Sequence, residues 1–496
     1  PRELMMSSVV ELMLLVSLGL RPSLHAAARK MEQLPVSLAA LYDKVNRTEP
    51  AVLRALVQGS AARLAPVMAQ LEGEASLAGW RLRILDGNHL PASHKRLAPL
   101  RDQRGAALPG HTLVVYDPDQ ALVTDIVACE DAHESERTVA QTLVAGAQAG
   151  ELWLADSHFC TRTLLQGWQQ AQAAFIVREH GTHPRLVEQG RWQEAGRCET
   201  GVLTEQSIGI EGEAVRWRRI QLVLDEPTRD GLTQLKLWSN LPPEVTAEQI
   251  ANLYRRRWRI EGLFGRIESV LHSEIRTLGH PRAALLGFAT AVLAYNVLSL
   301  LKRCIEQAHR EQVPELDVST YHLAVDVVSD YKGMLIALPP DAWSSWSEAS
   351  PVRTAEYLLR LARHVSPRSV ATSQRGPKKP KPKGYVEAAA VRKLRCPSNF
   401  AFQWAISCRL GLLIAVLADP LLKEPDRRAV TQRGVAATPV VEDFDVLEQV
   451  CLRVSSRRVG RAMHPLVLQA VEEAFCWRIV PAVALSAHRG CHAVFG

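Results

Sequence analysis

The amino-acid sequence predicts an α/β fold in which a mixed β-sheet is flanked by helices. Three apolar, strand-like runs follow one another from residue 80 to residue 129, RLRILDGNHL, HTLVVYDP and QALVTDIVACE, and Asp and Pro mark a turn between the last two. This pattern is typical of an antiparallel meander. The chain then alternates helix-like and strand-like segments, SERTVAQTLVAGAQ, ELWLADSHF, TRTLLQGWQQAQ and AAFIVREH. We therefore expect the first part of a core at residues 80–179, with helices joining its later strands.

A helical region is expected before this core, over residues 1–79. Residues 24–80 are rich in Ala and Leu with helical periodicity, and NRTEP separates two helical segments. The apolar run MMSSVVELMLLVSLGL contains Glu11 and lacks a basic segment before it, so an amphipathic or displaced upstream segment is favoured over a signal peptide. These helices would form a small bundle that covers the core.

A β-rich insertion is expected over residues 180–245. Asp156 and Glu261 are 105 positions apart (261 − 156), which is far more than one helix–strand connection needs. The strand-like runs EAVRWRRIQLVLD and TQLKLWSNL lie in this interval. Its tryptophans, Trp238 among them, belong to the core in the simplest interpretation.

A helix is expected from about Thr246 to about Leu271, because TAEQ is a capping pattern and helical periodicity follows it. Tyr254, Arg257 and Glu261 are spaced by three and four residues. On a helix this spacing puts them on one stripe, with a carboxylate beside a phenol and a guanidinium. Such a stripe suits a metal ion held against a phosphodiester.

Two further carboxylates accompany apolar strand-like runs, Asp86 in RLRILDGNHL and Asp156 in ELWLADSHFC. Magnesium prefers oxygen ligands, and two ions about 4 Å apart activate the attacking oxygen and stabilise the leaving one. Three carboxylates gathered without a metal ion would repel one another and raise a pKa. Asp86, Asp156 and Glu261 are therefore candidate ligands of a two-metal centre.

Three sequence blocks, LDGNHL, ADSHF and YRRRWRIEGLF, resemble the DDE transposases of the bacterial insertion-sequence-four family. The third block is the most specific, since the family signature is Y-x2-R-x3-E-x6-K. The resemblance extends from about Leu34 to about Lys383. It implies a ribonuclease-H-like fold, in which residues 246–310 supply the catalytic helix and the last core helix.

The resemblance also implies an activity. Asp86, Asp156 and Glu261 would be catalytic and bind two Mg²⁺ ions, for which Mn²⁺ can substitute. Tyr254, Arg257 and Arg256 would contact DNA, and Trp238 would either stack on an unpaired base or belong to the core. The helices of residues 1–79 would either bind the element end or cover the core without contacting DNA. The expected reaction is cut-and-paste transposition of an insertion sequence by strand nicking, a hairpin intermediate and strand transfer. The partners would be the double-stranded DNA of the element ends and of the target, bound by a homodimer.

One residue departs from the signature, because Glu268 stands where the family has Lys. An anion replaces a phosphate-contacting cation there, so either this subgroup uses the position differently or DNA-end binding is weakened. Two alternatives follow: a catalytically inactive DNA-binding remnant, and a related metal-dependent nuclease.

Composition is consistent with this function without specifying it. The net charge of +7 permits polyanion binding, and 47% hydrophobic with 22% charged residues indicates a globular chain. Nine cysteines without a CxxC pair suit a reducing cytosol, and we expect a cytoplasmic protein without a membrane span. Residues 311–384 are expected to be a helical extension that includes a Lys/Pro tract at 375–383. Residues 385–496 lie beyond the resemblance, and we interpret them as out-of-frame or fused sequence.

Overall fold

The structure, a computed structural model, describes residues 4–372 apart from gaps at 30–33, 72, 74, 91–110, 131–133, 229–230, 274–277, 279 and 338–348. The Lys/Pro tract and the interpretation of residues 385–496 lie outside the described residues.

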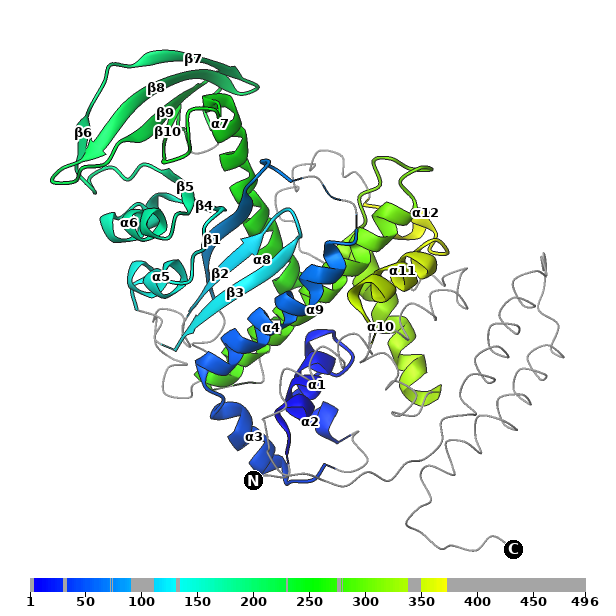
Figure 1. The fold of residues 1–496 in the computed structure, drawn as a ribbon. Coiled ribbons are helices and arrows are strands. Elements are labelled where there is room, and N and C mark those ends of the chain that lie inside the picture. The colour runs from blue at the N-terminus through cyan, green and yellow to red at the C-terminus, as the bar shows by residue number, and fades with distance from the viewer. Residues whose placement is uncertain are drawn as a thin grey trace, which may run out of the picture.

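The predicted meander is confirmed. β1 (Arg81–His89), β2 (His111–Asp117) and β3 (Leu122–Cys129) pair antiparallel in chain order (Figure 1). The next strands, β4 (Glu151–Ala155) and β5 (Ala174–Arg178), continue the sheet in parallel, β4 beside β1 and β5 beside β4. Each is preceded by a helix, α5 (Glu136–Val144) before β4 and α6 (Arg162–Gln170) before β5. This is the mixed α/β architecture that the sequence predicts, and it is consistent with a ribonuclease-H-like fold.

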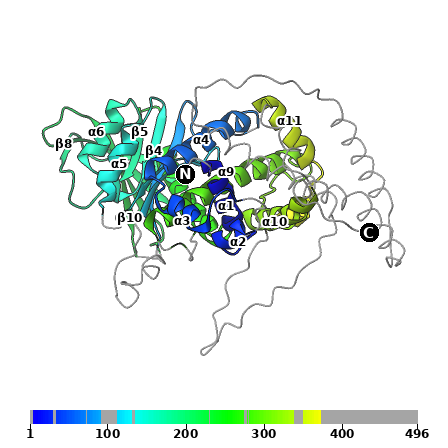
Figure 2. The same ribbon diagram turned by 90° about the horizontal axis from the view of Figure 1, so that it is seen from below.

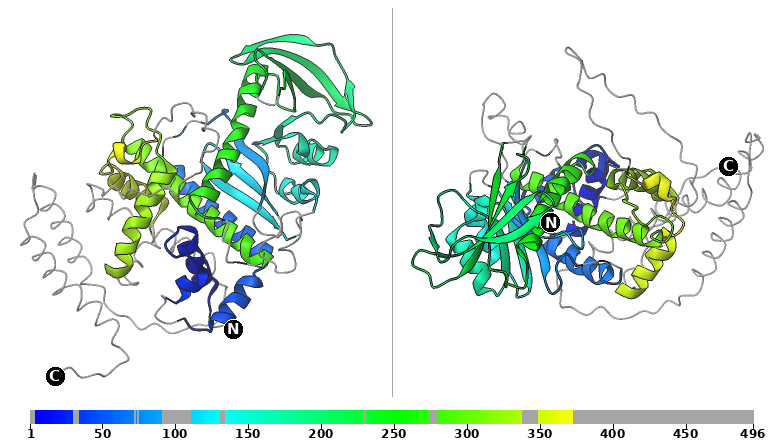
Figure 3. Two further views of the ribbon diagram at one scale, coloured as in Figure 1. Left: turned by 180° about the vertical axis from the view of Figure 1, so that it is seen from behind. Right: turned by 90° about the horizontal axis from the view of Figure 1, so that it is seen from above.

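The β-rich stretch after residue 180 extends the same sheet. β10 (Gln234–Ser239) pairs antiparallel with β5, and the full order is β3-β2-β1-β4-β5-β10-β9-β8-β6, with β7 beside β8. The outer strands are β6 (Leu186–Glu188), β7 (Gln193–Cys198), β8 (Gly201–Ile210) and β9 (Trp217–Leu224). Figure 3 shows these green outer strands at the end of the molecule opposite the yellow C-terminal helices. The sheet is therefore continuous from the meander into this stretch.

Helices cover both faces of the central strands. α5 and α6 lie on one face, and α4 (Pro50–Met68) and α9 (Pro281–Ala308) lie on the other (Figure 1). Successive strand residues point to opposite faces, so Ile84 belongs to the core under α4 and α9 and Leu85 to the core under α5 and α6. The strand that carries Asp86 is thus held from both sides.

α9 is the predicted last core helix. It is long and apolar enough to cross a membrane, but its most apolar window is entirely buried inside the protein, which is the placement of a core helix. Asn296 of α9 is a buried amide with satisfied hydrogen bonds, because its side chain accepts from Val123 N at 2.8 Å and donates to Val123 O at 2.9 Å. These bonds tie α9 to β3.

The N-terminal segment is helical and packs on this core helix. α1 (Met6–Ser17) lies against α9, where the Ser17 and Thr290 hydroxyls are 3.3 Å apart. α2 (Leu24–Ala28) and α3 (Leu38–Asn46) follow, and the predicted break at NRTEP separates α3 from α4. The apolar run at the start of the chain therefore contributes to the core.

The C-terminal extension is helical as expected, with α10 (Thr320–Ala337), α11 (Pro351–Ala362) and α12 (Pro367–Val370). Figure 2 shows α10 and α11 at the end of the molecule opposite β8.

The expected single helix from Thr246 to Leu271 is interrupted. α7 (Ala247–Arg255) begins with the predicted capping box of Thr246 and Gln249, and α8 (Arg259–Ser269) ends two residues before Leu271. Between them a 3-10 turn, η4 (Arg256–Trp258), tightens the backbone. The prediction of one continuous α-helix was wrong, and the turn includes Arg256 and Arg257.

Candidate active site

Two adjacent parallel strands bring Asp86 and Asp156 to the same level of the sheet. Ile84 of β1 is in register with Leu154 of β4, and each Asp stands two residues further along its strand direction. Asp86 lies within β1, while Asp156 follows β4 directly and caps η3 (Ser157–Phe159) by accepting from His158 N at 2.8 Å. Strand pairing alone therefore makes the two carboxylates neighbours.

Arg257 joins this pair to the third carboxylate. Its Nη1 lies 3.0 Å from Asp86 Oδ2, and its Nη2 lies 3.5 Å from Glu261 Oε1. The Arg257 side chain is 10% exposed and that of Glu261 is 49% exposed. The guanidinium is thus fixed at the buried Asp86, and Glu261 contacts it from the solvent side.

Tyr254 completes the predicted stripe. Its ring lies 6.0 Å from the Arg257 guanidinium carbon, and the residue is buried. Burial raises the pKa of its hydroxyl to about 12, against the opposing effect of Arg257. The phenol is therefore neutral at physiological pH and can donate a hydrogen bond.

Asp86 is the electrostatic centre of the group. Burial raises its pKa to about 6, Arg257 opposes that rise, and the charges of Asp156 and Glu261 add to it. Gly87 N also donates to Asp86 Oδ1 at 2.9 Å and stabilises the ionised form. Three carboxylates therefore interact at one place, as the sequence predicts for a site that attracts cations.

The set fits a divalent metal ion in charge and donor type. Carboxylate oxygens are the ligands that Mg²⁺ and Mn²⁺ accept, and a second positive charge beside Asp86 would lower its raised pKa. The separation of the carboxylates does not fit a metal ion in this conformation. In the part of the chain that the structure describes, no three His, Cys, Asp or Glu side chains are placed to hold one ion together.

The other predicted DNA contacts are placed differently. Arg256 turns toward Asp119, with Nη1 3.6 Å from Oδ1, and donates to the Ser76 hydroxyl. Trp238 is 1% exposed, and its Nε1 donates to Glu179 Oε2 at 2.9 Å. No face of the Trp238 ring is open to a base in this conformation, because the ring belongs to the core under α5 and α6. Of the two predicted roles of Trp238, the structure therefore supports packing in the core.

Trp258 is a candidate that the sequence pattern missed. Its place between charged residues predicts packing on the sheet, and that prediction was wrong because the side chain is exposed at 59%. The Arg257 guanidinium carbon lies 5.0 Å from its ring. An exposed aromatic ring beside a DNA-processing site is suited to base stacking. The 3-10 turn, which sequence periodicity does not reveal, directs it outward.

A second group that the sequence did not reveal lies beside Asp86. The Glu136 carboxylate packs against Gly87, where a β-carbon would come within 2.2 Å of it. It also faces two histidines, His89 Nε2 at 3.4 Å and His158 Nε2 at 3.6 Å. Glu136 therefore links the segments that follow the two aspartates, and glycine next to Asp86 is the one sequence signal of this contact.

Glu268, which departs from the signature, is exposed on α8. Arg266 does not take its place, since its guanidinium lies over the Tyr295 ring with 6.0 Å between them. The Arg266 charge is thus directed toward the core helix α9.

Comparison with known proteins agrees with this geometry. Residues 80–297, which contain all three carboxylates, match the family model of the transposase DDE domain. The match supports an enzyme of the DDE transposase class, which catalyses DNA cleavage and strand transfer. Enzymes of this class use divalent metal ions.

Two curated proteins are similar over a shared region. The putative transposase InsL for insertion sequence element IS186A of Escherichia coli (strain K12) is 27% identical over 318 residues, which cover 54% of this chain and 80% of that protein. The transposase for insertion sequence element IS421 of Escherichia coli has the same identity and coverage. These matches support transposase function for this chain.

Proposed function

We propose that this protein is an insertion-sequence transposase of the insertion-sequence-four type, with Asp86, Asp156 and Glu261 as its catalytic carboxylates. The observation that carries the proposal is the position of Arg257, which contacts Asp86 and Glu261 while Asp156 acts on the Asp86 pKa. The three carboxylates come from distant parts of the chain, and two of them share Arg257 as a partner.

The carboxylates would hold two Mg²⁺ ions, with Mn²⁺ as a substitute. When bound, these ions supply Lewis-acid activation of the attacking oxygen and stabilisation of the leaving oxygen. The protein's own contribution is to hold three anionic groups beside a rigid sheet, two of them on paired strands. The Asp86 side chain is 20% exposed against 49% for Glu261, and Asp86 would fix the position of the site.

Tyr254 and Arg257 would bind the backbone phosphate next to the cleaved bond. The phenol stays protonated and donates a hydrogen bond, and the guanidinium presents a planar pair of donors that matches a phosphate. For Arg257 to do so, it exchanges its carboxylate partners for phosphate oxygens. Trp258, exposed beside it, would stack on a base at the same end of the duplex.

The reaction that we propose is cut-and-paste transposition. Water hydrolyses one strand at the element end and frees a 3′ hydroxyl, which attacks the opposite strand to form a hairpin and release the flanking DNA. A second water opens the hairpin, and the 3′ hydroxyl then attacks a phosphodiester of target DNA to join the element to it. Each step is an in-line substitution at phosphorus, so one site with two metal positions serves all of them. Action on two ends implies a homodimer on DNA, and we expect the protein to act in the cytoplasm.

The test is cleavage of a duplex copied from the DNA that flanks the coding sequence. The purified full chain should nick it and form a hairpin with Mg²⁺ and leave it intact with EDTA. Asp156→Asn should abolish both products, while Asp225→Asn, an exposed aspartate on the β9 side of the sheet that pairs with Arg197, should retain them.

Other outcomes select the alternatives. Nicking without a hairpin or strand transfer would indicate a nuclease. Binding of the duplex without cleavage by the parent chain would indicate an inactive remnant and would direct attention to Glu268. Equal loss in both aspartate variants would overturn the assignment of Asp156.

A further inference from the structure

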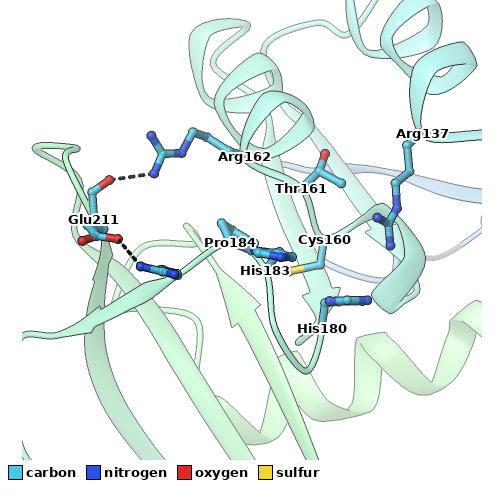
Figure 4. Close-up of a pocket in the computed structure, with 9 residues that line it drawn as sticks. Arg137, Cys160, Thr161, Arg162, His180, His183, Pro184 and Glu211 are labelled. Carbon is cyan, nitrogen blue, oxygen red and sulfur yellow. Dashed lines mark hydrogen bonds and ion pairs between the residues drawn. The ribbon is translucent and has the colours of Figure 1, made fainter.

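A second site, whose lining is rich in cationic side chains, lies beyond the loop that follows Asp156. A cavity of about 320 Å³ opens there, which is in the lower range of small-ligand sites. It lies between α6 and the segment after β5, and Figure 4 shows Arg162 and Glu211 on one side and Arg137 on the other. Its lining is Arg137, Cys160, Thr161, Arg162, His180, His183, Pro184, Arg185 and Glu211.

The charge of this lining is positive. Three arginines face one carboxylate, so the charges of these four side chains sum to +2 (three minus one). Burial raises the pKa of the Cys160 thiol to about 12, so it stays neutral and adds no negative charge. Cavity walls of low polarisability strengthen the field of such a cluster toward an anion.

The arginines are only partly neutralised by the protein. Arg185 and Glu211 are 3.9 Å apart, and both are well exposed, so that pair is weak. Arg162 donates to the Glu211 backbone carbonyl at 2.7 Å and lies 3.5 Å from the Glu213 carboxylate. Arg137 uses Nε for the His158 carbonyl at 2.7 Å, and no carboxylate pairs with it among the described residues. Several N–H donors therefore remain for a ligand.

We propose that this cavity, which we name the Arg137–Arg162 site, binds a backbone phosphate of the DNA substrate. The inference rests on the proposed function and adds a phosphate-binding site to it. Two observations favour a strand over a free anion. The site is open enough for Arg185 to be largely solvent-exposed, and it is linked to the candidate active site.

The link consists of consecutive hydrogen bonds. Asp156 accepts from His158 N at 2.8 Å, and His158 O accepts from Arg137 at 2.7 Å. A strand whose cleaved phosphate lies at Asp156 would therefore place a neighbouring phosphate at Arg137. Thr161 caps α6 at the same cavity, so the positive end of that helix adds to the attraction.

The experiment measures binding of the flanking-DNA duplex by the full chain in EDTA, as a function of salt concentration. Each phosphate contact adds about 0.9 to the slope of log affinity against log salt. Arg137→Gln and Arg162→Gln should each weaken binding and reduce the slope by about 1. Arg353→Gln, an exposed arginine on α11, is the matched control and should leave the slope unchanged.

A variant that should tighten DNA binding distinguishes a direct effect on binding from a loss of folded protein. Glu211→Gln removes the one carboxylate in the lining and should tighten binding. A neutral methylphosphonate placed at the contacted position should weaken binding to the parent chain and not to Arg162→Gln. Competition by inorganic phosphate at concentrations well below those that act through ionic strength would assign the site to a free anion and overturn the proposal.

Two failures can be told apart. If the parent chain binds no DNA, the proposed function falls and this inference falls with it. If the parent chain binds and cleaves DNA while the arginine variants keep the parent slope, only the Arg137–Arg162 site is contradicted.

Discussion

Arg257 Nη1 lies 3.0 Å from Asp86 Oδ2, across 171 residues of sequence. The contact fixes the second half of the DDE domain against its first strand. It also places the one cation of the predicted stripe at the half-buried Asp86 carboxylate. The candidate site is therefore an ion-pair network, and each member should influence the others.

A double-mutant cycle tests this coupling. Removing one partner of a buried pair is costly, so Arg257→Ala should lower the free energy of unfolding by about 3 kcal/mol. In an Asp86→Asn background the same change should cost at least about 1 kcal/mol less, because the carboxylate charge is already gone. Urea unfolding measures both. Asp225→Asn, which is distant from Arg257, is the control, and its effect on the free energy of unfolding should add to that of Arg257→Ala. If the effects of Asp86→Asn and Arg257→Ala also add, the coupling is contradicted.

The raised pKa of Asp86 predicts a stability cost that depends on pH. The folded-state pKa of about 6 exceeds the ordinary value of 3.8, so the folded protein binds the proton more tightly than the unfolded chain. The contribution to stability is present below pH 3.8 and is lost as pH rises through about 6. Asp86→Asn should therefore raise the free energy of unfolding at pH 7 by up to about 3 kcal/mol without metal.

Thermal unfolding across pH checks this. The advantage of Asp86→Asn should shrink toward zero well below pH 3.8, where the parent carboxyl is protonated in both states. A gain that is equal at both pH values, or a loss at pH 7, would contradict the assigned pKa. Mg²⁺ should stabilise the parent chain and leave the variant unchanged.

Trp258 should act in binding and not in stability. Its side chain is 59% exposed, so Trp258→Ala should change the free energy of unfolding by less than about 0.5 kcal/mol. Loss of a stacked base should weaken binding of the flanking-DNA duplex by about 1–3 kcal/mol. Tyr321→Ala, which removes another exposed aromatic ring on α10, is the control for anisotropy titrations. Equal affinities of the two variants would remove Trp258 from the DNA interface.

Trp238 should behave in the opposite way. Because its ring is buried and its Nε1 is bonded to Glu179, Trp238→Ala should cost about 3–5 kcal/mol of stability. Trp192→Ala, which removes a partly exposed tryptophan of the same β-rich stretch, should cost far less. Chemical denaturation compares them. If Trp238→Ala is as stable as the parent chain but defective in DNA binding, the result would support stacking of Trp238 on a base and contradict its role in the core.

Local patterns explain most of what could be predicted from the sequence. The capping box at Thr246, the meander of β1 to β3 and the spacing of Tyr254, Arg257 and Glu261 each depend on residues close together in the chain. Hydrophobic periodicity and helix capping act at this range, so single-sequence reasoning finds them.

The remaining features depend on contacts between distant segments. The pairing of β10 with β5 joins the β-rich stretch to the core sheet, and no local pattern encodes it. The η4 turn exposes Trp258, although the surrounding sequence has helical periodicity. The approach of Glu136 to Gly87 likewise requires α5 to pack over β1. Tertiary packing decided each of these.

The central claim is that Asp86, Asp156 and Glu261 surround one metal centre, and site-directed hydroxyl-radical cleavage tests it without a substrate. Fe²⁺ would replace Mg²⁺ in the full chain, and added peroxide and ascorbate would cut the backbone next to the bound ion. The account predicts cuts near residues 86, 156 and 261, which Mg²⁺ suppresses and which Asp86→Asn eliminates while Asp225→Asn does not. Cuts at only one of these positions, or at places unrelated to them, would contradict it.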